Sequence, residues 1–311
     1  MRSRLQSLVR AGAAAGVAWA TLACASCTLT TSLDGLSRPP DGDGGAAPGS
    51  EASPADGNFA ASEAASTSEA GAVESGAVES GAGEGGAPAP TYRAAVLADA
   101  PLAYWRLGES AGTKIAKDET GNGHDGMVGA NVVFGGGGAL AGETDTAANF
   151  DGSATGVITI GDFFRFDGVA SFTLEAWARP TGAGNYGVIL ARNLDPSGYA
   201  LYIAPSLGAA FERHKTGADD ILTGPSASTS SFTHVVATYD GSSMLLYVNG
   251  ALVQGPLPST AIPGGATKFF IGADVTGTSD SFNGSIDEPA VYDHALSATQ
   301  ILTHYRIGKG P

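Results

Sequence analysis

The chain has 311 residues, 46 of them glycine, and a formal net charge of −15. Glycine is about twice as frequent as the ~7% of average proteins, and charged residues, at 15%, fall below the usual ~25%. We expect no binding to nucleic acid, because contact with phosphates requires a basic surface. Two cysteines are too few for a disulfide scaffold or for a zinc site with four cysteine ligands.

Residues 1–27 have the pattern of an export signal. Three arginines within residues 1–10 precede an uncharged run of small and apolar residues, AGAAAGVAWATLA. A basic segment followed by 7–15 apolar residues is typical of a secretory signal peptide, and the run is shorter than the ~20 residues that a membrane-spanning helix needs. The sequence therefore predicts that the protein is exported.

The signal ends in TLACASC (21–27), which resembles a bacterial lipobox, where a cysteine is lipidated after cleavage. Cys27 is the favoured lipidation site, because the small residues Ala25 and Ser26 precede it, and Cys24 is the alternative. The resemblance implies a membrane anchor at the cell envelope or surface. An ordinary cleaved signal that releases a secreted protein is the other interpretation.

Residues 28–90 are predicted to form a disordered, acidic linker. Glycine, alanine, serine and proline dominate, GAVES occurs twice in tandem, and the stretch from Pro39 to Pro90 has no lysine or arginine. Such a segment cannot bury enough apolar surface to offset the entropy lost on ordering, and repulsion between like charges extends it. We expect a spacer between the N-terminus and a folded domain.

Residues 91–311 are predicted to form one folded domain of the all-β class. They hold all nine tyrosines and eleven of the twelve phenylalanines. Short runs of alternating apolar and polar residues recur between turn residues, which indicates antiparallel strands in a two-sheet sandwich. The predicted strands are 103–107, 156–160, 172–180, 186–192, 198–204, 209–213, 232–240, 243–250, 268–273 and 285–293.

Strand 172–180, FTLEAWARP, shows the alternation most clearly. A period of two places Phe172, Leu174, Ala176 and Ala178 on one face and Glu175 and Trp177 on the other. Trp105 and Trp177 are expected to be core residues. One short helix is predicted at the C-terminus, where Ser297 and Gln300 form a capping box ahead of an apolar stripe.

Six strings in the domain resemble one family when they are taken in order. They are YRAAVLADAPLAYWRLGE (92–109), DETGNGHDG (118–126), FDG (150–152), SFTLEAWARP (171–180), HVVATYDGSSMLLYVNG (234–250) and FNGSIDEPAVYDHALSATQI (282–301). Over residues 92–307 the chain is similar to the LamG-like jellyroll domains (Laminin_G_3 type) of the concanavalin A-like lectin/glucanase superfamily. The resemblance implies two packed antiparallel sheets, neighbouring termini, and binding rather than catalysis.

No catalytic residue is predicted. Glucanases of this superfamily carry carboxylates that alternate along one strand, so that both reach one glycosidic bond, and residues 92–311 contain no such run. Asp287 and Glu288 are adjacent, so they are expected to point to opposite faces. The domain also lacks G-x-S-x-G, cysteine and H-E-x-x-H. A polysaccharide hydrolase remains the third interpretation.

A calcium site is the predicted cofactor site. The loop DETGNG, which begins at Asp118, carries oxygen-bearing side chains at its first, third and fifth positions before a glycine, as the first half of a calcium loop does. The resemblance implies that Asp287 completes the site, with backbone carbonyls of Asn122 or His124 supplying further oxygens. The alternative is a turn without metal, because Asp and Asn before Gly commonly form turns.

The predicted ligand-binding residues lie near strand ends or loops. Sugar-binding proteins stack flat rings on pyranose faces and direct amide and charged groups at hydroxyls. The residues that fit this chemistry are Asn185, Tyr186, Tyr199, Arg213 and His214.

The sequence thus predicts an exported, lipid-anchored surface protein whose jellyroll domain binds a polysaccharide or glycan, with Ca²⁺ as its cofactor and without catalysis. The alternative is an adhesion or structural module that binds a surface protein.

Overall fold

The computed structural model describes residues 90–192, 197–215, 218–265, 267–274 and 280–311. The predicted signal peptide, both cysteines and residues 28–89 of the predicted linker lie outside the described residues. The predictions made for them stay predictions.

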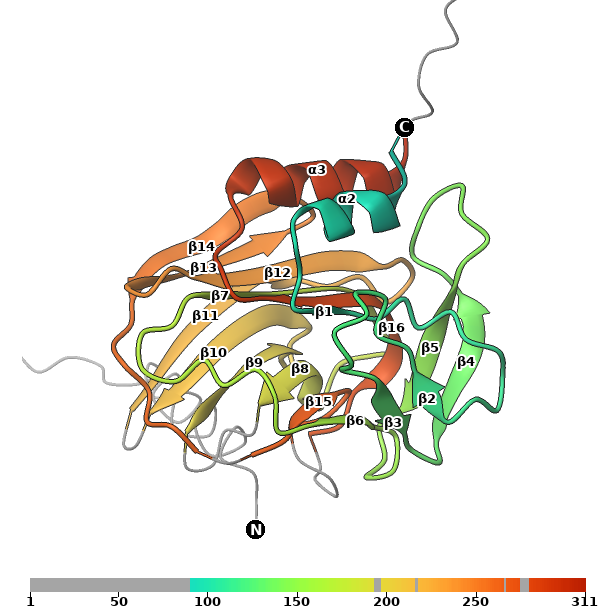
Figure 1. Ribbon diagram of the computed structural model, residues 1–311, viewed down its shortest axis with the longest axis horizontal. Coiled ribbons are helices and arrows are strands. Elements are labelled where there is room, and N and C mark those ends of the chain that lie inside the picture. Colours follow the sequence, from blue (N-terminus) through green and yellow to red (C-terminus); the bar gives the residue numbers. More distant parts are fainter. Residues whose placement is uncertain (1–89, 193–196, 216–217, 266, 275–279) are drawn as a thin grey trace, which may run out of the picture. The chain divides into compact units, whose positions relative to one another are not determined.

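Two antiparallel sheets make up the domain (Figure 1). The strands of sheet 1 are β1 (Ala103–Tyr104), β4 (Val132–Gly137), β5 (Thr146–Asp151), β7 (Phe172–Pro180), β12 (Thr233–Tyr239), β13 (Ser243–Val248), β14 (Ala251–Pro258) and β16 (Asn283–Tyr292). Those of sheet 2 are β2 (Ile115–Ala116), β3 (Gly126–Val128), β6 (Ile158–Gly161), β8 (Gly187–Arg192), β9 (Gly198–Ile203), β10 (Gly208–Lys215), β11 (Ala218–Ser226) and β15 (Phe269–Ile271).

Strands distant in sequence are neighbours in both sheets. Sheet 1 has the order β14-β13-β12-β7-β16-β5-β4, with β1 also paired to β16, and sheet 2 has the order β11-β10-β9-β8-β15-β6-β3-β2. The predicted all-β, two-sheet antiparallel jellyroll sandwich is therefore confirmed.

The main core lies between the sheets, as the alternation along β7 predicts. Phe172, Leu174 and the two alanines at 176 and 178 belong to this core, together with the fully buried Trp105. Trp177 points to the other face of β7 and joins a second apolar cluster with residues of two helices. Both tryptophans are core residues, as expected.

Two helices lie on the outer face of sheet 1 (Figure 1). Helix α3 (Ala298–Lys309) begins with the predicted capping box, in which Ser297 Oγ accepts from the backbone N–H of Gln300. Helix α2 (Tyr92–Ala98) was not predicted. It has only seven residues, so it depends on the burial of Tyr92 and Val96 rather than on helical propensity.

The two ends of the domain lie side by side, because α2 and α3 pack together. Pro90 and Ala94 line one groove together with Thr303 and Ile307 of α3. Gly308 permits the close approach of α3 to the sheet, since a Cβ there would come within 2.5 Å of the Trp177 ring. Among the described residues, no helix has the length and hydropathy needed to cross a membrane.

Glu175 joins these elements through a buried hydrogen-bond network. One carboxylate oxygen accepts from Tyr92 Oη of α2 at 3.0 Å and from His234 Nε2 of β12 at 2.8 Å. The other accepts from Tyr292 Oη of β16 at 2.9 Å, and His304 Nδ1 of α3 lies 3.1 Å from both oxygens. The network therefore connects both helices to three neighbouring strands of sheet 1.

Glu175 and His304 each stabilise the charged form of the other. Burial alone would raise the pKa of Glu175, but the charge of His304 and hydrogen bonds from His234 and His304 hold that pKa well below its usual value. Burial alone would lower the pKa of His304, but Glu175, followed by Asp99 at 3.1 Å from Nε2, raises it to about 9. At neutral pH the centre is a carboxylate–imidazolium pair.

Removal of the Glu175 charge should destabilise the domain strongly. We expect Glu175→Gln to lower the free energy of unfolding by about 3–5 kcal/mol, because it leaves the His304 cation buried with only Asp99 nearby. Urea denaturation of the full chain measures this. The control is Glu119→Gln, which breaks the partly exposed pair with Arg93 and should cost less than ~1 kcal/mol. Equal effects of the two variants would contradict the central role of Glu175.

Stability should fall at both ends of the pH range. The raised pKa of His304 adds on the order of 3 kcal/mol to the free energy of unfolding. This contribution is complete below the unfolded pKa of ~6.5 and is lost as pH rises through about 9. Glu175 contributes above its unfolded pKa of ~4.3, and that contribution is lost as pH falls. The other groups facing the pair are Asp99, His234 and the two tyrosine hydroxyls. Urea midpoints between pH 6 and pH 10 should decline in the wild type and flatten in His304→Gln; parallel declines would refute the assignment.

Candidate functional site

A shallow pocket of about 110 Å³ lies where the β7–β8 loop meets the beginning of β16. The loop residues Thr181, Ala183 and Asn185 form one wall and are exposed, and Asn283 forms the opposite wall. Thr181 donates from its backbone N–H and its hydroxyl to the Asn283 carbonyl, at 3.0 and 3.2 Å, so the two walls are fixed to each other. The two asparagine side chains stand at the mouth of the pocket.

Aromatic residues form the floor of the pocket. Tyr186 is 5% exposed and Phe282 is fully buried. Gly187 makes room for this floor, because a Cβ there would meet the Phe282 ring at 3.0 Å. The hydroxyl of Tyr186 is buried without a hydrogen-bond partner among the described residues. Both rings are therefore almost completely covered, and they support the pocket from below rather than form its exposed surface.

The structure brings two of the predicted ligand-binding residues to this pocket, namely Asn185 and Tyr186. Tyr199 and Arg213, which the sequence placed near exposed strand ends, lie in the interior instead. Tyr199 packs against Phe172 with their rings tilted by 36°, and it donates its hydroxyl to the Phe164 carbonyl at 2.6 Å. Its ring cannot stack on a sugar from that position.

Arg213 is fully buried and is held by structural contacts. Its guanidinium lies 3.5 Å from the Tyr239 ring centroid and donates to the carbonyls of Thr260 and Gly168, at 2.9 and 3.1 Å. The alternation along β10 explains this placement, since Phe211 and Arg213 point inward. Ala210, Glu212 and His214 therefore project from the outer face of sheet 2.

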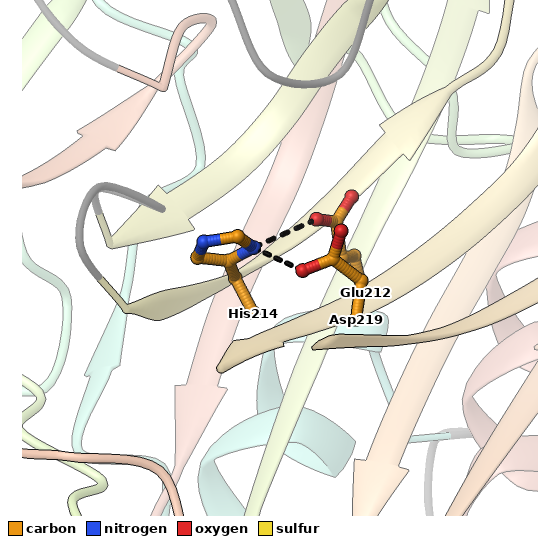
Figure 2. Close-up of side chains that lie close together, drawn as sticks. All are labelled: Glu212, His214 and Asp219. Carbon is orange, nitrogen blue, oxygen red and sulfur yellow. Dashed lines mark ion pairs between the residues drawn. The ribbon is translucent and has the colours of Figure 1, made fainter. Parts of the chain in front are cut away.

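His214 lies in a group that the sequence analysis did not recognise. Figure 2 shows it on β10 with Glu212 and with Asp219 of β11. Glu212 lies in the predicted strand 209–213, but His214 lies one residue beyond it, and β11, which places Asp219 opposite His214, was not predicted. Thr181 and Asn283 of the pocket were also missed, and no sequence signal distinguishes them from ordinary turn residues.

The loop predicted to bind calcium is held by hydrogen bonds of its own. The Asp118 carboxylate accepts from the backbone N–H groups of Tyr104, Thr120 and His124, at 3.2, 3.0 and 3.1 Å, and from the Thr120 hydroxyl at 2.7 Å. Asn122 Nδ2 and His124 Nδ1 donate to the Leu102 carbonyl, at 2.9 and 3.1 Å. The loop is thereby attached to the segment that leads into β1.

The carbonyl oxygen of His124, which the sequence analysis offered as a ligand, is also engaged. Trp105 Nε1 donates to it at 2.9 Å. Asp118 and Asp287 do not belong to one cluster of three or more His, Cys, Asp or Glu side chains among the described residues. The calcium site stays a prediction.

Asp287 belongs to a different cluster. It is grouped with Asp145 and Glu288, and all three potential ligand atoms lie within 4.8 Å of one another. The expectation that Asp287 and Glu288 point to opposite faces is wrong, because β16 has a bulge there and Glu288 adopts a φ of 54°. Arg106 already supplies a cation, with contacts of 2.6 Å to Asp145 and 3.2 Å to Glu288.

Burial raises the pKa of Asp287 well above its usual value, and burial likewise raises the pKa of Glu288. A hydrogen bond from the Ala139 N–H at 2.7 Å opposes the effect at Asp287. A cluster with raised carboxyl pKa values and its own guanidinium has a reduced need for a metal ion. We therefore assign it a structural role next to β1.

Part of the described domain matches a known protein family. Residues 151–302 match the family described as the concanavalin A-like lectin/glucanases superfamily. They form a concanavalin A-like lectin/glucanase domain. No curated protein matches the sequence at a significant level.

Three solved structures are similar in fold. Domain 4 of AbnA, a GH43 extracellular arabinanase from Geobacillus stearothermophilus in complex with arabinotriose, has a TM-score of 0.52 at 18% identity, over 66% of this chain and 98% of that one. The binding domain of Paraclostridial Mosquitocidal Protein 1 has a TM-score of 0.51 at 13% identity, over 66% of this chain and 51% of that one. The botulinum neurotoxin serotype G binding domain has a TM-score of 0.50 at 16% identity, over 66% and 50%. At these identities the likeness establishes the fold of the lectin-like domain.

The Asp118 loop should stabilise the lectin-like domain without metal. We expect Asp118→Ala to lower the free energy of unfolding by at least ~2 kcal/mol, because it leaves buried N–H groups without an acceptor. Ca²⁺ or a chelator should not change the melting temperature of either protein. Asp293→Ala, at an exposed position, is the control and should stay within ~0.5 kcal/mol of the wild type. A Ca²⁺-dependent increase that Asp118→Ala abolishes would instead support the calcium prediction.

Proposed function

We propose that the lectin-like domain is a non-catalytic carbohydrate-binding module and that the pocket between the β7–β8 loop and β16 receives the sugar. The observation that carries this proposal is that two exposed amide side chains, Asn185 and Asn283, line one pocket. Amides both donate and accept hydrogen bonds, as sugar hydroxyls do.

The size of the pocket restricts how a glycan binds. About 110 Å³ is smaller than the ~300–1,000 Å³ of pockets that enclose a whole drug-sized ligand. We therefore propose that one sugar residue, such as the end of a chain, enters the pocket while the rest stays on the surface. This mode requires little closure, in keeping with walls that are already joined through Thr181 and Asn283.

The fold relatives support a glycan as the ligand class. Domain 4 of AbnA, the similar structure that this chain covers almost completely, is in complex with arabinotriose. The described strands carry no alternating run of carboxylates, and two of their glutamates are buried: Glu175 lies under the helices, and Glu288 beside Arg106. We propose binding without turnover for this reason.

The N-terminal predictions complete the proposal. Export, lipid attachment at Cys27 or Cys24, and an acidic spacer would display the domain at the cell surface, where polysaccharides are accessible. These steps are supported by the sequence pattern alone.

Glycan binding should depend on the two amides at the pocket mouth. In calorimetric titrations of the full chain with arabinotriose and a panel of other oligosaccharides, we expect Asn185→Ala and Asn283→Ala each to weaken binding about three- to tenfold, the equivalent of one lost hydrogen bond. Asn131→Ala is the matched control, because Asn131 bonds to Asp151 and Ser153 and does not line the pocket.

Wild-type affinity in both pocket variants would remove the pocket from the proposal. A folded chain that binds no member of the panel would contradict carbohydrate binding and favour the protein-binding alternative.

A further inference from the structure

The strongest unassigned feature is the group formed by Glu212, His214 and Asp219 on the outer face of sheet 2 (Figure 2). The register of the β10–β11 hairpin pairs His214 directly with Asp219. Glu212 is two residues before His214 on β10, so the period of a strand places all three side chains on one face. The three come together because of strand geometry rather than loop conformation.

The three side chains are close together and shielded from water. Glu212 is 1% exposed, His214 is 4% exposed, and the Asp219 side chain is 8% exposed. His214 Nδ1 forms an ion-pair contact with Asp219 Oδ1 and lies 3.8 Å from Glu212 Oε1. One potential ligand atom from each residue lies within 4.8 Å of both others.

On β9, which pairs with the other edge of β10, the residues opposite His214 and Glu212 are small. The register with β9 places Gly198 opposite His214 and Ala200 opposite Glu212. Neither of these two positions therefore contributes a large side chain beside the imidazole or the Glu212 carboxylate.

The cluster carries excess negative charge. Burial, followed by the charges of Asp219, Asp274 and Asp280, raises the pKa of Glu212 to about 8. The basic residues of β10 do not neutralise it: Lys215 bonds to Asp220 at 2.5 Å, and Arg213 points into the interior. Glu212 Oε2 is also buried without a hydrogen-bond partner among the described residues. Unlike the Asp145, Asp287 and Glu288 cluster, this group has no guanidinium in contact with its carboxylates among the described residues, so either a retained proton or a bound cation offsets their loss of hydration.

We propose that Glu212, His214 and Asp219 bind a divalent transition-metal ion, with Zn²⁺ as the ion that fits best. One imidazole nitrogen and two carboxylate oxygens form a donor set that Zn²⁺ accepts, with a further position for water or an incoming ligand. Ligand atoms of a tetrahedral zinc site lie roughly 3.3 Å apart, which this cluster reaches with small side-chain movements. Ca²⁺ fits less well, because it takes six to eight oxygen ligands.

The site is adjacent to the proposed glycan pocket. The pKa of Tyr186, which lines the pocket, is raised first by burial and then by the nearby charges of Asp280 and Glu212. Tyr186 also packs against Tyr202 of β9, with ring centroids 5.9 Å apart. A bound cation would therefore alter the environment of the pocket floor. Binding of the ion itself does not depend on the presence of a sugar.

The test is direct titration of the chelator-treated full chain with ZnCl₂ by calorimetry, and with CoCl₂ by visible absorption. We expect one equivalent to bind. His214→Ala and Asp219→Asn should each weaken Zn²⁺ binding by tenfold or more, and His214→Ala should change the Co²⁺ spectrum, because the nitrogen ligand is lost. The matched control is His294→Ala, since His294 also contacts an aspartate, Asp293 at 3.0 Å, but is 41% exposed and outside the cluster.

Asp219→Asn also guards against a folding artefact. Because Asn keeps the size of Asp219 and an oxygen that can accept a hydrogen bond from His214, the metal-free variant should remain folded, and its melting temperature without metal is the reference for its own response to Zn²⁺. The wild type should gain melting temperature on addition of Zn²⁺ and this variant should not. The proposal is overturned if the folded wild type binds no Zn²⁺, or if His214→Ala binds with the affinity and Co²⁺ spectrum of the wild type.

Discussion

The position of Glu175 is the constraint on which the rest of the domain depends. Its carboxylate is fully buried on the helix side of β7, where an unpaired charge would be prohibitive. Four side chains from four elements, Tyr92, His234, Tyr292 and His304, satisfy it. Because two of these come from helices near the two ends of the domain, the same interaction that stabilises the carboxylate also fixes both ends on sheet 1.

Because both helices are held on sheet 1, only one of the two outer faces of the sandwich carries helices. The outer face of sheet 1 is covered by α2 and α3, with Trp177 packed against Tyr305 and Gly308 of α3. The pocket at the β7–β8 loop and the acidic cluster on sheet 2 are formed by residues outside these helices.

The alternation of apolar and polar residues in the sequence predicted much of the fold. The predicted strand 172–180 coincides with β7, and the strand at 198–204 matches β9 to within one residue. Strands β2, β3, β4, β5, β11 and β14 escaped prediction. Glycines or prolines interrupt the patterns of β4, β11 and β14, β2 and β3 have only two and three residues, and β5 consists mostly of small and polar residues. Alternation is informative only where one face of a strand is buried and the other is not.

The candidate site was less predictable, for a similar reason. Asn185 and Tyr186 were selected from residue type and position, and both line the pocket. Tyr199 and Arg213 have the same chemical character, but their strand phase directs them inward, and only the register of the sheet reveals this. The bulge at Glu288 likewise has no clear sequence signal, since it places a non-glycine residue at a positive φ.

Two buried glutamates of this domain, Glu175 and Glu212, each lie beside histidine, but their charges are compensated to different degrees. Glu175 accepts hydrogen bonds from four donors and faces two imidazoles, so its charge is compensated within the fold. Glu212 is equally buried, but three further carboxylates act on it and one of its oxygens has no hydrogen-bond partner among the described residues. A fold tolerates such an uncompensated site only at a cost in stability, which a ligand that binds there recovers. The same pair of residue types thus completes the architecture on one sheet and forms the proposed cation site on the other.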